Sequence, residues 1–204
     1  MSSNNHWNEV YSKKSEAELS WHQDDPSVSV DLIKTAGLTT TSAVIDIGGG
    51  TSRLIERMLD LGVSDLTVLD LSEAAISTAR HRLGERETSV KWIVEDINRW
   101  EPTQTYDVWH DRAVFHFLVK PKDRIAYIQR LSRSVVQGGH AIIATFAPEG
   151  PEKCSGLPVA RYSPASLDQT LGANFSLLTH RFYLHHTPWG NQQSFQYSLF
   201  LKLN

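Results

Sequence analysis

The sequence has little of the chemistry that marks secreted, membrane or nucleic-acid-binding proteins. Cys154 is its single cysteine, which excludes an internal disulfide. No apolar run approaches the roughly 20 residues that a membrane span needs, and the polar N-terminus lacks the pattern of a secretory signal. A net charge of −3 provides no basic excess for binding nucleic acid. We therefore expect a cytoplasmic protein without a membrane or nucleic-acid partner, and its oligomeric state stays open.

What the sequence does contain is an alternation of short apolar runs with longer amphipathic stretches. This alternation indicates an open, mostly parallel sheet covered by helices. The expected strands are residues 43–47, 66–71, 90–94, 106–110 and 140–146, and the expected helices are residues 52–61, a segment from Ser72 onward, and 121–136. A glycine turn at residues 137–139 is expected to end the last of these helices, and a loop is expected over 148–164.

The end of the chain changes character. Residues 175–184 and 193–202 both alternate in polarity around a turn at 186–191, a pattern that predicts an antiparallel hairpin. The expected fold is therefore a doubly wound, Rossmann-like α/β sheet of seven strands, mostly parallel, with an antiparallel C-terminal hairpin. Residues 41–204 would form this domain, and residues 1–40 would form a helical cap on it.

A glycine-rich loop, Asp46-Ile47-Gly48-Gly49-Gly50-Thr51-Ser52, follows the first expected strand. In doubly wound sheets ligands bind outside the carboxyl ends of the strands, and glycines let the backbone approach them closely. Asp70 ends the next strand, about 20 residues further on, where a carboxylate reaches ribose hydroxyls. Because the three glycines are consecutive, they do not match the G-x-G-x-x-G pattern of a dinucleotide site. Asp46 would repel a pyrophosphate but suits an ammonium-bearing ligand; a purely structural turn is the alternative.

The segment from Val44 to Ser52 resembles the first motif of class I S-adenosylmethionine-dependent methyltransferases, whose pattern is acid-x-Gly-x-Gly-x-Gly. Ser52 stands where the third glycine of that pattern is usual. Four later segments, residues 69–72, 94–97, 106–111 and 137–140, resemble further motifs of the family in the same order. The resemblance covers roughly residues 40 to 204.

This resemblance implies S-adenosylmethionine as the cofactor and gives it binding residues. Gly48 and Gly50 would contact its methionine moiety, and Asp70 would bind the ribose. Asp96 and Ile97 would contact the adenine. The alternative is that Asp46 and Asp70 only cap helices and that Asp96 only begins a turn. The complete expected cofactor set is Tyr11, Trp21, Asp46, Gly48, Gly49, Gly50, Asp70, Leu71, Asp96, Ile97 and Asp111.

The methyl acceptor is expected between the cap, the loops after the fourth and fifth strands, and the hairpin. These segments are rich in aromatic side chains, whose ring faces stabilise a cation such as a sulfonium. Residues 111–116 are similar to the Asp-Lys-Gly-Thr-aromatic-Asp segment of some protein-lysine methyltransferases and to the Asp-Arg-Gly/Ala segment of thiopurine methyltransferases. The expected catalytic residues are His110, Asp111 and His116. Asp111 would steer a cationic acceptor, and either histidine would accept its proton.

We therefore expect a methyltransferase that acts on a nitrogen or sulfur atom of a protein lysine or of a small thiol or amine. An NAD(P)-binding oxidoreductase and a non-catalytic domain that only binds the cofactor are the alternatives. Cys154 invites a thiol or metalloid role, but one cysteine cannot form a soft-metal site and the nearby histidines lack zinc-ligand spacing. No metal is expected.

Overall fold

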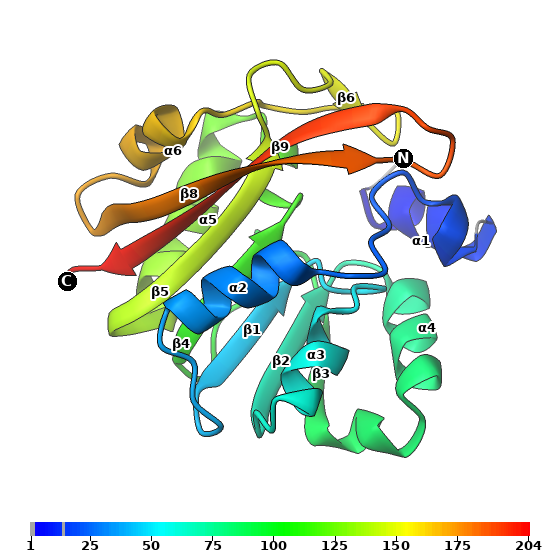
Figure 1. Ribbon diagram of the computed structural model, residues 1–204, viewed down its shortest axis with the longest axis horizontal. Helices are drawn as coiled ribbons and strands as arrows, with labels where there is room; N and C mark the ends of the chain where they lie inside the picture. Colours follow the sequence, from blue (N-terminus) through cyan, green and yellow to red (C-terminus); the bar gives the residue numbers. More distant parts are fainter. Residues whose placement is uncertain (1–2, 14) are drawn as a thin grey trace.

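The computed structural model describes residues 3–13 and 15–204, with side chains from His6 onward, and is built around a seven-stranded sheet (Figure 1). The sheet strands are β1 (Ala43–Ile47), β2 (Asp65–Asp70), β3 (Val90–Val94), β4 (Tyr106–Arg112), β5 (Val135–Phe146), β8 (Phe175–His186) and β9 (Gln192–Lys202). Their order is β3-β2-β1-β4-β5-β9-β8, parallel from β3 to β5 and antiparallel across β9 and β8. The predicted Rossmann-like fold with a terminal hairpin is confirmed.

Helices cover both faces of this sheet (Figure 1). They are α1 (Ser3–Lys13), α2 (Ser27–Thr35), α3 (Leu54–Asp60), α4 (Glu73–Leu83), α5 (Pro121–Ser134) and α6 (Pro164–Leu171), with short 3-10 turns η1 (Glu16–Glu18), η2 (Gly84–Ser89) and η3 (Phe115–Phe117). Val44 packs in one core cluster with α2 and α3, whereas the adjacent Ile45 packs in a second with α5 and α6. Strand β1 is apolar on both faces because each face packs against helices. Within the described residues, no helix combines the length and apolar character that crossing a bilayer requires.

The expected cap of residues 1–40 divides into two parts; Met1, Ser2 and Lys14 lie outside the described residues. Helix α2 is a layer of the core, because Leu32 and Ile33 are buried against the sheet. Helix α1 instead lies beside α4, next to the carboxyl ends of the strands (Figure 1).

Two local expectations are wrong. The helix expected over 121–136 ends at Ser134, and residues 137–139 form a bulge inside β5 rather than a turn before it. The pairing with β4 shifts there, from Tyr106 opposite Val135 to Val108 opposite His140, and Gly138 supplies the positive φ of +77°. The expected loop over 148–164 contains a small hairpin, β6 (Lys153–Cys154) with β7 (Leu157–Pro158). Helix α6 then follows, begun by a Ser163 capping box, and it was not predicted.

Candidate active site

The glycine loop after β1 is packed so closely that side chains do not fit. A Cβ atom on Gly49 would lie 2.4 Å from Asp46 Oδ2, and one on Gly50 would lie 2.7 Å from Asp70 Oδ2. The Gly50 N–H donates to the same Asp70 oxygen at 3.0 Å. The loop is thereby fixed to the end of β2, and its backbone forms one wall of a pocket.

Asp46 is a buried carboxylate with one free oxygen. Its Oδ1 is hydrogen-bonded to His110 Nδ1 at 2.7 Å, and His110 Nε2 lies 2.9 Å from Ser29 Oγ on α2. Its Oδ2 has no hydrogen-bond partner among the residues that the structure describes. Leaving a buried oxygen of this kind unpaired costs about 1–3 kcal/mol or more. A donor from a bound ligand, such as an ammonium group, fits this position.

A pocket extends from the glycine loop to the end of β4 and passes under the N-terminal segment. It is lined by Tyr11, Trp21, His22, Gln23, Pro26, Ser29, Asp46, Gly48, Gly49, Thr51, Ser52, Arg53, His110 and Arg112. Six residues of the expected site are therefore brought together here: Tyr11, Trp21, Asp46, Gly48, Gly49 and His110. Ser29 and Arg112 are lining residues that the sequence reasoning missed.

Asp70 lies at the end of β2, buried below α1. Its oxygens accept the backbone N–H groups of Gly50 and Ser72, at 3.0 and 2.7 Å. Burial raises the pKa of the Asp70 carboxyl to about 6, against the opposing effect of these two hydrogen bonds. Ser72 Oγ in turn donates to Asn8 Oδ1 at 2.8 Å, so α1 is bound directly to this corner of the sheet.

Aromatic rings hold the N-terminal segment over the pocket. Trp7 of α1 makes edge contacts with Trp21, at 5.6 Å between ring centroids, and with Phe117, at 5.1 Å. Tyr11 contacts Trp21 at 6.0 Å. Burial and the nearby Asp70 charge raise the pKa of the Tyr11 hydroxyl, which therefore stays protonated and able to donate. We call Trp7, Tyr11, Trp21 and Phe117 the aromatic lid.

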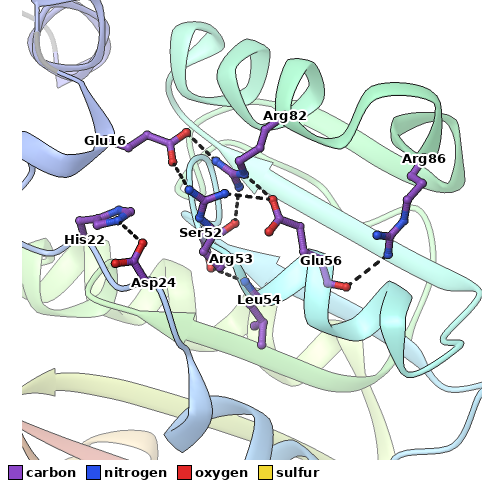
Figure 2. A network of polar contacts seen from close by, with 9 residues as sticks. All are labelled: Glu16, His22, Asp24, Ser52, Arg53, Leu54, Glu56, Arg82 and Arg86. Atoms are coloured by element: carbon purple, nitrogen blue, oxygen red, sulfur yellow. Dashed lines mark hydrogen bonds and ion pairs between the residues drawn. The ribbon is translucent and has the colours of Figure 1, made fainter.

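An ionic network anchors the same segment to the helices beside the pocket (Figure 2). Glu16 of η1 pairs with Arg82 of α4 and with Arg53 at the start of α3. Arg82 also pairs with Glu56 and donates to the Ser52 carbonyl oxygen at 2.9 Å. Because Ser52 and Arg53 line the pocket, this network links the position of the lid to the glycine loop.

The residues expected at the adenine lie at the same edge of the sheet, beside Asp70. Asp96 Oδ1 accepts the Asn98 N–H at 2.9 Å, which makes it part of a turn after β3. Ile97 is buried in the core cluster that contains Leu69. Leu71 is half-buried directly after β2. Among the residues lining the pocket described above, none of Leu71, Asp96 and Ile97 occurs.

Asp111 is fully buried and occupied by internal hydrogen bonds. It accepts from Tyr127 Oη at 2.6 Å and from the backbone N–H groups of Val114 and Phe115 at 2.9 and 3.1 Å. Burial raises the pKa of its carboxyl to about 6. These bonds brace the turn after β4, where Ala113 has a φ of +72°.

His116 and Cys154 are also buried. The His116 ring packs against Phe117 and Phe146, and neither of its nitrogens has a partner among the described residues. Burial and the Arg112 charge lower the pKa of His116 to about 3, so its imidazole is neutral and weakly basic. Burial raises the pKa of the Cys154 thiol to about 12, which leaves it protonated.

Comparison with known proteins identifies the domain. A family model described as "Methyltransferase domain" matches residues 44–139, which include the glycine loop, Asp70, Asp96 and β4. Residues 44–139 belong to this methyltransferase family.

Relatives agree with this assignment. Malonyl-[acyl-carrier protein] O-methyltransferase of Paenibacillus sp. (strain JDR-2) is 29% identical over 117 residues, 55% of this chain and 41% of the relative. The eEF1A lysine and N-terminal methyltransferase of Danio rerio is 25% identical over 152 residues, 72% of this chain and 22% of the relative. This chain thus spans less than half the length of either protein. The N-methyltransferase NodS of Bradyrhizobium japonicum WM9, in complex with S-adenosyl-L-homocysteine, superimposes with a TM-score of 0.74 at 15% identity, over 98% of this chain and 99% of that one.

The fold and the family match are those of a class I methyltransferase domain, for which S-adenosylmethionine is the expected cofactor. Three observations show that the residues present fit this molecule. Gly48 and Gly49 line the pocket without side chains, Asp46 Oδ2 is an unpaired acceptor that an ammonium group can satisfy, and Asp70 ends β2 at the carboxyl edge of the sheet, where ligands of doubly wound folds bind.

Proposed function

We propose that this chain transfers a methyl group from S-adenosylmethionine to an acceptor that enters the pocket between the aromatic lid and the end of β4. The observation that carries the proposal is the unpaired Asp46 Oδ2 beside the glycine loop. When bound, S-adenosylmethionine supplies a methyl group on a sulfonium, whose sulfur keeps the electron pair of the breaking C–S bond.

The protein's own contribution is placement. The glycine loop and Asp46 hold the methionine end, Asp70 holds the ribose, and the lid covers the pocket and excludes water. Orientation of this kind supplies up to about 7–11 kcal/mol of the barrier reduction in well-placed reactions. His110 is held between Asp46 and Ser29, so it acts by positioning Asp46.

The acceptor atom that we propose is a nitrogen or sulfur, in a small thiol or amine or in a protein lysine. Two observations favour a second candidate, a carboxylate oxygen. The Paenibacillus relative is named for O-methylation of a malonyl group. His116 is a weak base in this structure, and a carboxylate needs no base because it arrives without a proton.

Cofactor binding and transfer test this function separately. Calorimetric titration with S-adenosylmethionine and with NAD distinguishes a methyltransferase from an oxidoreductase. Asp70→Ala should weaken the binding of S-adenosylmethionine. Incubation with methyl-labelled cofactor and a panel of thiols, amines, carboxylates and cell lysate then identifies what gains the methyl by mass spectrometry. Labelled protein bands would favour the lysine acceptor, and label confined to small molecules would exclude it. No binding at about millimolar cofactor, with Asp70→Ala changing nothing, would refute the proposal.

A further inference from the structure

Arg112, the last residue of β4, is a cation whose position is fixed but whose charge is not balanced. Its Nε donates to Tyr197 Oη at 2.9 Å, and its Nη1 donates to the Trp21 carbonyl oxygen at 2.8 Å. The guanidinium also lies over the Phe195 ring, 4.9 Å from its centroid. All of these partners are neutral. Among the described residues, no carboxylate forms an ion pair with Arg112.

One donor of this guanidinium is unused. Arg112 Nη2 is buried and has no hydrogen-bond partner among the described residues. Arg112 also lines the pocket that contains Asp46 and the glycine loop. Desolvation of a cation with a free donor is unfavourable, and an anion in hydrogen-bond contact with it offsets this loss of solvation.

The groups around Arg112 add no negative charge. Its field lowers the pKa of His116, of Cys154 and of His185, so these three groups lie within its electrostatic reach. Burial keeps both histidines neutral and the thiol protonated, because it lowers the histidine pKa values and raises that of Cys154. Arg112 therefore brings an unpaired positive charge to the pocket that Asp46 also lines.

We propose that Arg112 binds an anionic group of the methyl acceptor, so that the substrates are small molecules carrying a carboxylate or a comparable anion. The inference rests on the proposed function, and it narrows the acceptor class whichever atom receives the methyl. A lysine ammonium would meet a like charge at this position and is disfavoured.

The anion that binds Arg112 could also come from the cofactor, because its methionine moiety carries a carboxylate. Binding of S-adenosylhomocysteine separates the two. If Arg112 holds the cofactor, Arg112→Gln weakens S-adenosylhomocysteine binding. If it holds the acceptor, the dissociation constant changes less than about threefold, and the loss is confined to the acceptor KM.

The experiment starts from the small-molecule fraction of a cell lysate, separated on anion and cation exchangers. Each fraction is incubated with the full-length protein and methyl-labelled S-adenosylmethionine. We expect the acceptor in the fraction retained by the anion exchanger. With that fraction, Arg112→Gln should raise the apparent KM at least tenfold, and Arg112→Lys should raise it less because it keeps the charge. Tyr197→Phe is the matched control, since it removes one partner of the guanidinium and leaves Nη2 in place.

An acceptor that flows through the anion exchanger or is retained by the cation exchanger overturns the proposal. An equal KM for Arg112→Gln and wild type, in proteins that bind S-adenosylhomocysteine normally, also overturns it, as does a loss of S-adenosylhomocysteine binding in both Arg112 variants but not in Tyr197→Phe. Absence of transfer into every small-molecule fraction, with label in lysate protein instead, overturns this inference and leaves the proposed function standing. Absence of transfer into small molecules and protein alike overturns the proposed function and this inference with it.

Discussion

Replacing Asp46 with asparagine changes one interaction at the centre of the proposed cofactor site and leaves the shape of the side chain the same. The amide oxygen retains the hydrogen bond with His110 Nδ1, which spans 2.7 Å in the native protein. The amide nitrogen then stands at the position of Oδ2, the oxygen that has no partner among the described residues. A donor therefore replaces an acceptor where the cofactor ammonium is proposed to lie.

The expected loss of affinity follows from the strength of a hydrogen bond between an ammonium group and a carboxylate. A hydrogen bond between charged groups contributes about 1.5–3 kcal/mol. Since every 1.4 kcal/mol is tenfold in affinity, Asp46→Asn should weaken S-adenosylhomocysteine binding by about 10- to 150-fold. The asparagine donor opposes the ammonium, so the upper half of this range is expected.

Calorimetric titration with two ligands isolates the effect. S-adenosylhomocysteine carries the amino-acid moiety, whereas 5′-methylthioadenosine lacks it. Asp46→Asn should weaken binding of the first ligand and leave the second unchanged. Asp111→Asn is the matched control, because Asp111 is equally buried but bonded to Tyr127 and the turn after β4. It should lower stability without changing either affinity.

Two results would refute this reasoning. Equal binding of S-adenosylhomocysteine by Asp46→Asn and wild type would show that Oδ2 does not face the ammonium. An equal loss for both ligands would show that the substitution acts on the glycine loop as a whole.

Three further predictions concern the glycine loop, Asp70 and the ionic network. Gly50→Ala places a Cβ 2.6 Å from the Ala75 Cβ and 2.7 Å from Asp70 Oδ2, so it should lower the free energy of unfolding in urea by about 1–3 kcal/mol and weaken S-adenosylhomocysteine binding. An unchanged urea midpoint would contradict this packing. The pKa of Asp70 is about 6, and we propose that its ionised form accepts the ribose hydroxyls. S-adenosylhomocysteine affinity should therefore be constant above about pH 7 and fall by up to about tenfold per unit below pH 6, and Asp70→Asn should show no such dependence; a flat wild-type profile would exclude Asp70 from the ribose. Glu16→Gln weakens the ion pairs with Arg53 and Arg82, so it should lower the free energy of unfolding by about 1 kcal/mol and speed amide hydrogen exchange in α1 and η1. Glu9→Gln, which affects the exposed pair with Lys13, should not speed this exchange. Equal exchange in both variants would argue against the network as the anchor of the lid.

The central strands were predictable from the sequence because they are buried on both faces. Residues 43–47, predicted as a strand, are β1 in full, since a short β-branched run that ends at glycines has few other solutions. The glycines at 137–139 misled the prediction because glycine marks both helix ends and β-bulges, and only pairing with β4 separates the two. Helix α6 has eight residues and a weak apolar pattern, so its Ser163-Pro164 start was its main signal.

The site was predictable only where it is local. The glycine loop and Asp70 follow from motifs within a span of about 25 residues, and the structure joins them through the Gly50 N–H. The lid depends on contacts between distant residues, such as Asn8 with Ser72 and Glu16 with Arg82, which are 64 and 66 positions apart. No periodicity in the sequence carries such contacts. For the same reason the pairing of His110 with Asp46, also 64 positions apart, was not foreseen.

The charge expected of the acceptor depends on one property of β4, the alternation of its side chains. Along a strand, residues two apart share a face. His110 and Arg112 face the pocket, whereas Trp109 and Asp111 face α5 and bond to Tyr127. The sequence analysis gives the steering role to the carboxylate of Asp111 and assigns none to the adjacent Arg112. The structure supports Arg112 instead. Asp111 faces away from the pocket and accepts hydrogen bonds from the turn after β4, whereas Arg112 faces the pocket and has a free donor. A one-residue shift of β4 would exchange the two, so the sign of the acceptor charge that we propose rests on the register of β4 against β1, in which Asp46 lies opposite His110.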